Sequence, residues 1–531
     1  MSALLSPPRR LRARFTVPGE GSYELSADVP PPTPRPPPPP PAKPPPPPLP
    51  GPLGLPTVTK LAFATDAAVR PPDHPDHEPL FSFRKLTAFT SLTAKFAADD
   101  DHPPSQPAQT SPSTPSAVLA YNAADTVYLL DVANPTEELF SLAIRTTPTA
   151  LAITAVDGLR LLVGTASGEV VYYPDLSERR RATTSLPQSC VYNKDGSLSS
   201  SRVVAVKWLP NSAHKFLSLH LDGALIVYDD RMKPSALRPD DNARAVAADE
   251  RPDRERLRVG LHDVHVTNVK GKRSNPATVL HIGRTSLTDC SFAPSINPDS
   301  ASALATTARD GYLRIIHFNN QHISIAFRSY FGALLCVAWS PDGKYVATGG
   351  EDDLVSIFSP SEERLVARLE GHTSWVSAVA WDHACNRPGT YRLGSAGQDA
   401  KLLLWDFDLE TLHHPQRNSM TRRRSYRETN GMSNGERRQS KISRLRGHTQ
   451  DPEPHYPLIV PAPGRAEVPL VEPLVAHVAH GEPLTDVWFL DGGVFTADAV
   501  GGVKMWSRPP QHAVPELSLG KGGSRAATDL D

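Results

Sequence analysis

The chain has 531 residues, 56 of them proline, and a formal net charge of −1. The near-neutral charge excludes a general basic field for binding nucleic acid, and without a run of about 18 apolar residues no membrane span is expected. The four cysteines, at positions 190, 290, 336 and 385, form no C-x-x-C pair, which argues against a disulfide framework or a zinc ribbon. The N-terminus also lacks the apolar core of a secretory signal. We therefore expect an intracellular protein, in the cytoplasm, with the nucleus as an open alternative.

The N-terminal region is dominated by proline. Residues 30–56 contain 18 prolines, and each proline fixes φ and removes a backbone donor, so the segment cannot join a sheet. We expect residues 1–56 to be a disordered proline-rich leader that is dispensable for folding. Its polyproline II stretch is interpreted as a spacer, with a ligand for SH3- or WW-type domains as the alternative.

Four further stretches are polar or charge-mixed and show no hydrophobic periodicity. We expect three disordered inserts and a disordered tail, at about 97–116, 231–275, 409–475 and 511–531. Structureless stretches of this length are unusual inside a compact domain and indicate disorder or a functional loop.

The third insert is strongly basic. Residues 417–446 hold ten Lys or Arg and only two acidic residues. Simple disorder is one interpretation, and phosphorylation of Ser425 and Ser440 is another, because each follows arginines at positions −3 and −2. A nuclear-import signal ranks third. Binding of nucleic acid ranks last, because no aromatic residues are interleaved with the basic ones.

Between these stretches the chain repeats itself. Each copy has short runs of alternating apolar residues broken by Gly and Asp turns, which is typical of antiparallel strands. The turn between the second and third run of each copy falls near Asp125, Gly168, Asp222, Asp310, Asp352, Asp399 and Val500. Seven such units resemble WD40 repeats and predict an all-β, seven-bladed β-propeller over residues 57–510. Residues 57–67 and 81–96 are the candidates for the strand that closes the ring against the last blade.

One copy contains a complete set of polar residues. His372, Ser395, Asp399 and Trp405 match the hydrogen-bonding tetrad of WD40 repeats, in which the histidine links the serine to the carboxylate. The other copies retain only part of this set, and because position 500 is Val we expect the last blade to lack the aspartate. The chain has no P-loop, no G-x-S-x-G elbow and no H-E-x-x-H motif. We therefore predict no catalytic residue, no cofactor and no metal site.

Several segments go beyond the generic repeat. FTVPGEGSYELS, SLHLDGALIVYDDR, RTSLTDCSFAPSINPDS, GHTSWVSAVAWD and SAGQDAKLLLWDFD resemble the CreC family of filamentous fungi, catabolite-repression proteins related to animal WD-repeat proteins that activate ubiquitin-specific proteases. The resemblance covers most of 57–510 and the proline-rich leader. It implies a non-enzymatic scaffold that binds and stabilises or activates a CreB-type deubiquitinase in carbon catabolite repression. It does not identify the partner-contact residues.

A competing interpretation is a substrate receptor of a cullin-type ubiquitin ligase. Many propellers of that kind carry a W-D-x-R box at the end of the third strand. Tyr228-Asp229-Asp230-Arg231 is close to this box, with Tyr in place of Trp. An enzyme with an active site on the propeller is a third, weaker alternative.

Overall fold

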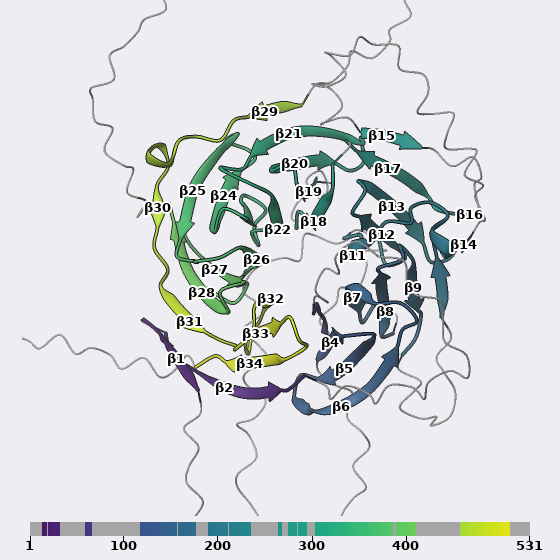
Figure 1. The fold of residues 1–531 in the computed structure, drawn as a ribbon, viewed down its shortest axis with the longest axis horizontal. Helices are drawn as coiled ribbons and strands as arrows, with labels where there is room; N and C mark the ends of the chain where they lie inside the picture. Colours follow the sequence, from purple (N-terminus) through teal and green to yellow (C-terminus); the bar gives the residue numbers. More distant parts are fainter. Residues whose placement is uncertain are drawn as a thin grey trace, which may run out of the picture.

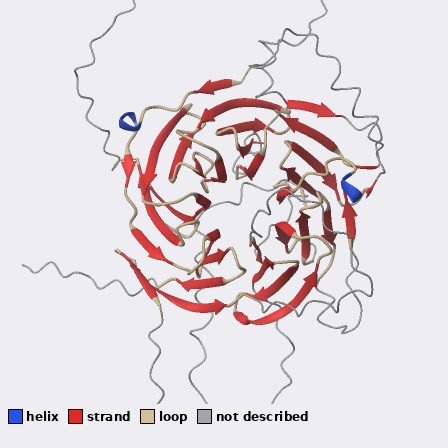
Figure 2. Ribbon diagram, viewed as in Figure 1, coloured by secondary structure: helices blue, strands red, loops and turns tan. Residues whose placement is uncertain are grey.

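The computed structural model describes residues 13–31, 59–65, 117–176, 189–234, 264–267, 274–294, 303–409, 412 and 457–509, except 19, 157, 211, 284 and 386–388. Seven sheets, antiparallel except at the outer edges of two of them, surround a central channel (Figure 1), and strands make up nearly all the regular structure (Figure 2). The only helices among these residues are two single-turn 3-10 helices, η3 (Lys194–Gly196) and η4 (Arg465–Glu467). None of the described helices is long and apolar enough to cross a bilayer. The predicted all-β, seven-bladed propeller is confirmed.

Each blade begins with an innermost strand at the channel and adds strands outward. Blade 1 contains β3 (Leu61–Thr65), β4 (Ala117–Ala123), β5 (Thr126–Asp131) and β6 (Asn134–Ala143). Blade 2 contains β7 (Pro148–Thr154), β8 (Arg160–Thr165), β9 (Val170–Tyr173) and β10 (Cys190–Tyr192). Blade 3 contains β11 (Val203–Trp208), β12 (Lys215–His220), β13 (Ala224–Asp229), β17 (Thr278–Ile282) and β15 (Val264–Thr267). Blades 4 and 5 contain β18 (Leu287–Phe292), β19 (Ala303–Ala308), β20 (Tyr312–His317), β21 (His322–Arg328) and β29 (Leu458–Val460); and β22 (Leu334–Trp339), β23 (Val346–Gly350), β24 (Leu354–Ser359), β25 (Arg364–Glu370) and β30 (Leu470–Val471). Blades 6 and 7 contain β26 (Val376–Trp381), β27 (Thr390–Gly397), β28 (Lys401–Asp408) and β31 (Val475–Val478); and β32 (Leu484–Leu490), β33 (Gly493–Asp498), β34 (Val503–Ser507), β2 (Gly21–Val29) and β1 (Arg14–Val17).

The ring is closed by a strand that the sequence analysis placed in the disordered leader. Strand β2 pairs antiparallel with β34, with Leu25 opposite Trp506, so the N-terminal hairpin completes the last blade. The prediction of disorder over 1–56 is therefore wrong for this hairpin, because the proline-dense stretch begins only after β2. Residues 57–67 contribute β3, which is the innermost strand of blade 1 and does not pair with blade 7. The other candidate, 81–96, lies outside the described residues.

A chain of buried and half-buried charges fastens this hairpin to the propeller. Glu20, in the β1–β2 turn, forms ion pairs with Arg392 of blade 6 and with Arg508, which follows β34. Arg392 also donates to Asp406 at 2.7 Å, and Arg508 donates to Asp382 at 2.7 Å. The five alternating charges join the two ends of the described chain to blade 6.

Two of the predicted disordered inserts contain ordered strands. In the range 409–475, residues 457–471 run along the outside of blades 4 and 5 (Figure 1), and we call this segment the strap. Within 231–275 lie β15 and the two-residue strands β14 (Lys233–Pro234) and β16 (Ser274–Asn275), which pair with each other in parallel. The strap and the β14–β16 pair were missed because short edge strands that pair over long sequence separations leave no periodic pattern. Strand β15 pairs with the nearby β17, but its four residues are too few to show a period. The other expected disordered stretches, 97–116 and 511–531, lie outside the described residues.

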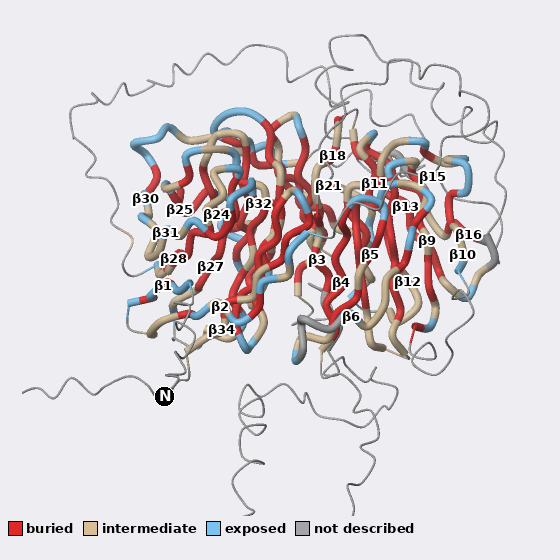
Figure 3. The backbone as a smooth tube through the Cα atoms, turned by 60° about the horizontal axis from the view of Figure 1, so that its bottom comes forward, coloured by how far each residue is buried: buried red, intermediate tan, exposed pale blue. Residues whose placement is uncertain are grey.

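The core is apolar between neighbouring blades, and polar side chains join the innermost strands. Buried strands form the body of each blade, with exposed loops at their ends (Figure 3). At four of the seven blade junctions, a described Ser or Thr near the start of an inner strand donates to a backbone carbonyl at or just before the start of the next inner strand. These bonds are Thr149 to Val203 at 2.6 Å, Thr288 to Leu334 at 2.7 Å, Ser377 to Leu484 at 2.6 Å and Thr485 to Thr59 at 2.8 Å.

Candidate protein-docking face

The structure brings the four predicted tetrad residues of blade 6 together. Nδ1 of His372 lies 3.1 Å from Asp399, and Nε2 lies 2.7 Å from the Ser395 hydroxyl. The indole N–H of Trp405 donates to the same hydroxyl at 2.8 Å. Burial acts to raise the pKa of Asp399, but hydrogen bonds from His372 and the Thr373 backbone outweigh it and hold the pKa at about 2. This chain of bonds links the loop before the inner strand to the strand pair behind it.

Blade 7 contains a second complete tetrad, contrary to the prediction that its aspartate is missing. His480 lies 2.9 Å from Asp498 and 2.8 Å from the Thr496 hydroxyl, to which Trp506 donates at 3.2 Å. Asp498 stands two residues after Thr496, whereas Asp399 stands four after Ser395. The Thr496–Trp506 spacing equals the Ser395–Trp405 spacing and could have identified the set.

Blade 5 lacks a histidine in the loop before its inner strand, residues 329–333. Its aspartate, Asp352, accepts a hydrogen bond from the backbone N–H of Leu354 at 3.3 Å. Burial raises the pKa of Asp352 to about 6. Asp399 of blade 6 therefore ionises readily, whereas burial disfavours the ionised form of the corresponding Asp352 in blade 5.

The tetrads mark one face of the disc. In a four-stranded antiparallel blade, the loop before the inner strand and the loop between the second and third strands emerge at the same edge. These loops carry four of the exposed large apolar side chains: Phe331 is 72% exposed, Val500 52%, Tyr330 47% and Trp375 44%. We call these four residues the docking face. They come from the loops around blades 5, 6 and 7.

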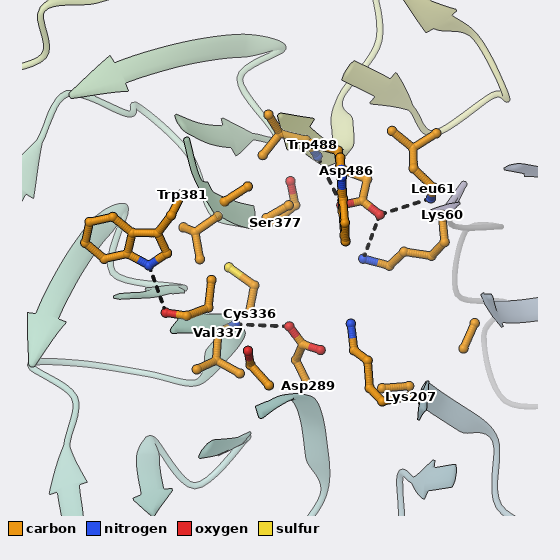
Figure 4. A pocket seen from close by; sticks show the side chains of 18 of the residues that line it. Lys60, Leu61, Lys207, Asp289, Cys336, Val337, Ser377, Trp381, Asp486 and Trp488 are labelled. Carbon is orange, nitrogen blue, oxygen red and sulfur yellow. Dashed lines mark hydrogen bonds and ion pairs between the residues drawn. The ribbon is translucent and has the colours of Figure 1, made fainter. Parts of the chain in front are cut away.

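The central channel is lined by inner strands and holds a cavity of about 250 Å³ (Figure 4). Lys60 lies 3.9 Å from Asp486, and Asp289 accepts a hydrogen bond from the Val337 backbone at 3.0 Å. Burial raises the pKa of Asp289, against the opposing influence of Lys207 and Lys60. These charges compensate one another across the blades. We therefore assign them to ring assembly.

The two buried cysteines are poorly suited to act as nucleophiles. Burial raises the pKa of Cys290 to about 12 and raises that of Cys336 as well, so both thiols stay protonated. Among the residues that the structure describes, no group of three or more His, Cys, Asp or Glu is arranged to hold a metal ion. Ser425 and Ser440, the predicted phosphorylation sites, lie outside the described residues.

The charged residues of the ligase-type box, Asp229 to Arg231, form their contacts within this chain. The guanidinium of Arg231 donates to both carboxylate oxygens of Asp229, at 3.0 and 2.8 Å. Asp230 accepts from Arg160 and Tyr172, each at 3.1 Å. These contacts give Arg231 a partner inside its own blade.

Comparison with known proteins supports the repeat assignment. The family model described as WD domain, G-beta repeat matches residues 325–359 and 363–406. This chain carries WD40 repeats. It is also 28% identical over 365 residues to the UBP9-binding protein bun62 of Schizosaccharomyces pombe (strain 972 / ATCC 24843). That match covers 66% of this chain and 62% of the relative, so it spans somewhat less than two thirds of the length of the curated protein.

Proposed function

We propose that this WD-repeat protein is a non-catalytic scaffold that binds a ubiquitin-specific protease and stabilises or activates it. The observation that carries the proposal is the pair of exposed aromatic side chains, Phe331 and Trp375, in neighbouring loops of one face. Aromatic side chains are enriched at the centres of protein interfaces, where they contribute a large part of the binding energy once buried. The relative from Schizosaccharomyces pombe is named as a UBP9-binding protein, and this supports the class of partner.

The geometry suits a platform better than a reaction centre. The loop of Trp375 is held by the tetrad of blade 6. Blade 5 has no tetrad, but the loop of Phe331 is fixed by a hydrogen bond from the backbone N–H of Ala333 to Glu351 at 3.1 Å. Both aromatic side chains are therefore presented on a rigid base. A rigid base lowers the entropy lost when a partner binds. WD40 propellers and binding proteins of this type are typically non-catalytic, which agrees with the proposed scaffold role.

The finer assignment rests on the resemblance to the CreC family. It names a CreB-type deubiquitinase as the partner and carbon catabolite repression as the process. The composition of the chain supports a place in the cytoplasm, and the basic insert supports the nucleus as the alternative. Binding of an SH3- or WW-type domain by the proline-rich stretch belongs to the same set of proposals. A phosphorylation switch at Ser425 and Ser440 also belongs to this set.

Affinity capture from cells of the native organism, followed by mass spectrometry, tests the proposal. The full chain and a variant with both Phe331→Ala and Trp375→Ala are compared, with Leu409→Ala as the control. Leu409 is also exposed but follows β28, at the other edge of the disc. We expect a ubiquitin-specific protease with the full chain and the control, and its loss with the double variant. Recovery of a cullin adaptor without any protease would overturn the proposal in favour of the ligase receptor.

A further inference from the structure

The strap follows the outer edges of two blades. Strand β29 pairs in parallel with β21 of blade 4, with Ile459 opposite Ala326. Strand β30 pairs in parallel with β25 of blade 5, with Leu470 opposite Arg368. Between these pairings lies η4, where Arg465 forms an ion pair with Glu370. The strap therefore bridges blades 4 and 5 from outside.

One buried side chain of the strap packs in the hydrophobic core. Val468 is only 3% exposed and belongs to the cluster between blades 4 and 5 that includes Phe327, Leu334 and Leu365. Removing this apolar side chain from water stabilises the docked strap. The strap is thus part of the folded propeller.

Arg368 is the polar anchor of the strap. This side chain is fully buried, and its guanidinium donates to the carbonyl of Pro463 at 2.7 Å and to that of Gly464 at 3.1 Å. The backbone N–H of Arg368 donates to the Pro469 carbonyl at 3.0 Å. Its Nε has no partner among the described residues. Burying a guanidinium costs more free energy than burying an apolar side chain of the same size. Packing alone therefore does not explain an arginine at this position.

The same guanidinium also contacts the docking face. The Cζ of Arg368 lies 4.7 Å from the centre of the Tyr330 ring, which is the distance of a cation–π contact. Tyr330 precedes Phe331, the most exposed residue of the docking face. One side chain therefore touches the strap carbonyls and the loop that presents Phe331.

We propose that Arg368 is a positioning residue for the docking face, through which the strap sets the place of the Tyr330–Phe331 loop. This inference rests on the proposed function, since it makes the strap a determinant of protease affinity. The planar guanidinium suits the position because it forms hydrogen bonds at its edge and stacks on an aromatic ring with its face. A lysine would retain the charge but could not do both.

The first test does not involve the partner. Amide hydrogen exchange at residues 329–333 is compared in the full chain, in Arg368→Met and in Arg364→Met. Arg364 lies on the same strand but is exposed, and its ion-pair partner is Glu362, at 2.6 Å, among the residues that the structure describes. We expect about tenfold faster exchange in the loop for Arg368→Met and no change for Arg364→Met. Unchanged exchange in Arg368→Met would overturn the positioning role.

A second variant covers the case in which Arg368→Met does not fold. Tyr330→Leu removes the stacked ring from a half-exposed position and leaves the buried guanidinium in place. We expect the same acceleration of exchange at residues 331–333. If that loop stays protected without the ring, the stacking contact does not hold it, and the proposal is wrong.

The second test measures affinity for the CreB-type protease in a double-mutant cycle. We expect Arg368→Met to weaken binding about five- to tenfold in the full chain and to have little effect in a Tyr330→Leu background. An equal loss in both backgrounds would show that Arg368 acts only through general stability, and would overturn the proposal. Absence of any binding by the full chain would instead refute the proposed function, while the exchange experiment would still decide the role of Arg368.

Discussion

His480 Nδ1 lies 2.9 Å from Asp498 Oδ2, so the last blade contains the same buried histidine–carboxylate pair as the blade before it. The blade that the closing hairpin completes and the blade before it are therefore the two in which the described residues form complete tetrads. Ring closure depends on these blades, because the N-terminal hairpin pairs with blade 7 and forms its ion pairs with blade 6 and with Arg508.

We predict that Asp498→Ala destabilises the protein as strongly as Asp399→Ala. Each substitution leaves a buried histidine without its partner, which costs about 2–4 kcal/mol. Urea unfolding measures both, with Val500→Ala as the control at a half-exposed neighbouring position. A midpoint for Asp498→Ala that equals that of Val500→Ala would contradict the second tetrad.

Asp352→Asn should stabilise the protein at neutral pH. Burial raises the pKa of Asp352 to about 6 in the folded state, above its ordinary value of about 3.9, so the folded protein holds this proton more tightly than the unfolded chain. Stability from this group is present below about pH 4 and is lost as the pH rises through 6. We expect a gain of about 1–3 kcal/mol for Asp352→Asn at pH 7.5 and none at pH 4. Denaturant midpoints at the two pH values check this, and a gain of equal size at both would be inconsistent with the buried carboxyl.

Asp399 should show the opposite pH dependence. Its folded-state pKa of about 2 lies below its ordinary value, so its contribution is present above about pH 4 and is lost as the pH falls toward 2. Asp399→Asn should therefore flatten the acid limb of the stability curve. Thermal melting between pH 2.5 and 5 measures this limb, and an unchanged slope in the variant would refute the assignment.

Glu20→Ala should weaken the attachment of the N-terminal hairpin to the propeller. The substitution leaves Arg392 and Arg508 without their shared carboxylate, at a cost of about 2–4 kcal/mol. The control is Glu24→Ala, an exposed carboxylate on the same hairpin. Chemical unfolding should separate the two variants clearly. Identical midpoints would show that the buried charges do not hold the hairpin.

The repeat pattern predicted the propeller because blade strands are local, alternate regularly and end at Gly and Asp turns. The pattern could not predict the pairing of β2 with β34, since the two partners lie almost 480 residues apart. The strap escaped detection because β29 and β30 are two or three residues long and pair in parallel at an edge. Asp498 was missed because it stands two positions before position 500, where the repeat pattern placed the aspartate. From there its carboxylate still reaches His480. The exposure of Phe331 depends on the loop path, so the sequence alone did not separate it from a core aromatic residue.

The central claim is tested most directly by titrating the purified CreB-type protease with the purified protein. We predict saturable binding by the full chain and by Leu409→Ala, and a loss of affinity of about 100-fold or more when Phe331 and Trp375 are both changed to alanine. Circular dichroism confirms that the double variant is folded. Equal affinity of the folded double variant and the full chain would contradict the docking face, and no binding by the full chain would contradict the proposed scaffold.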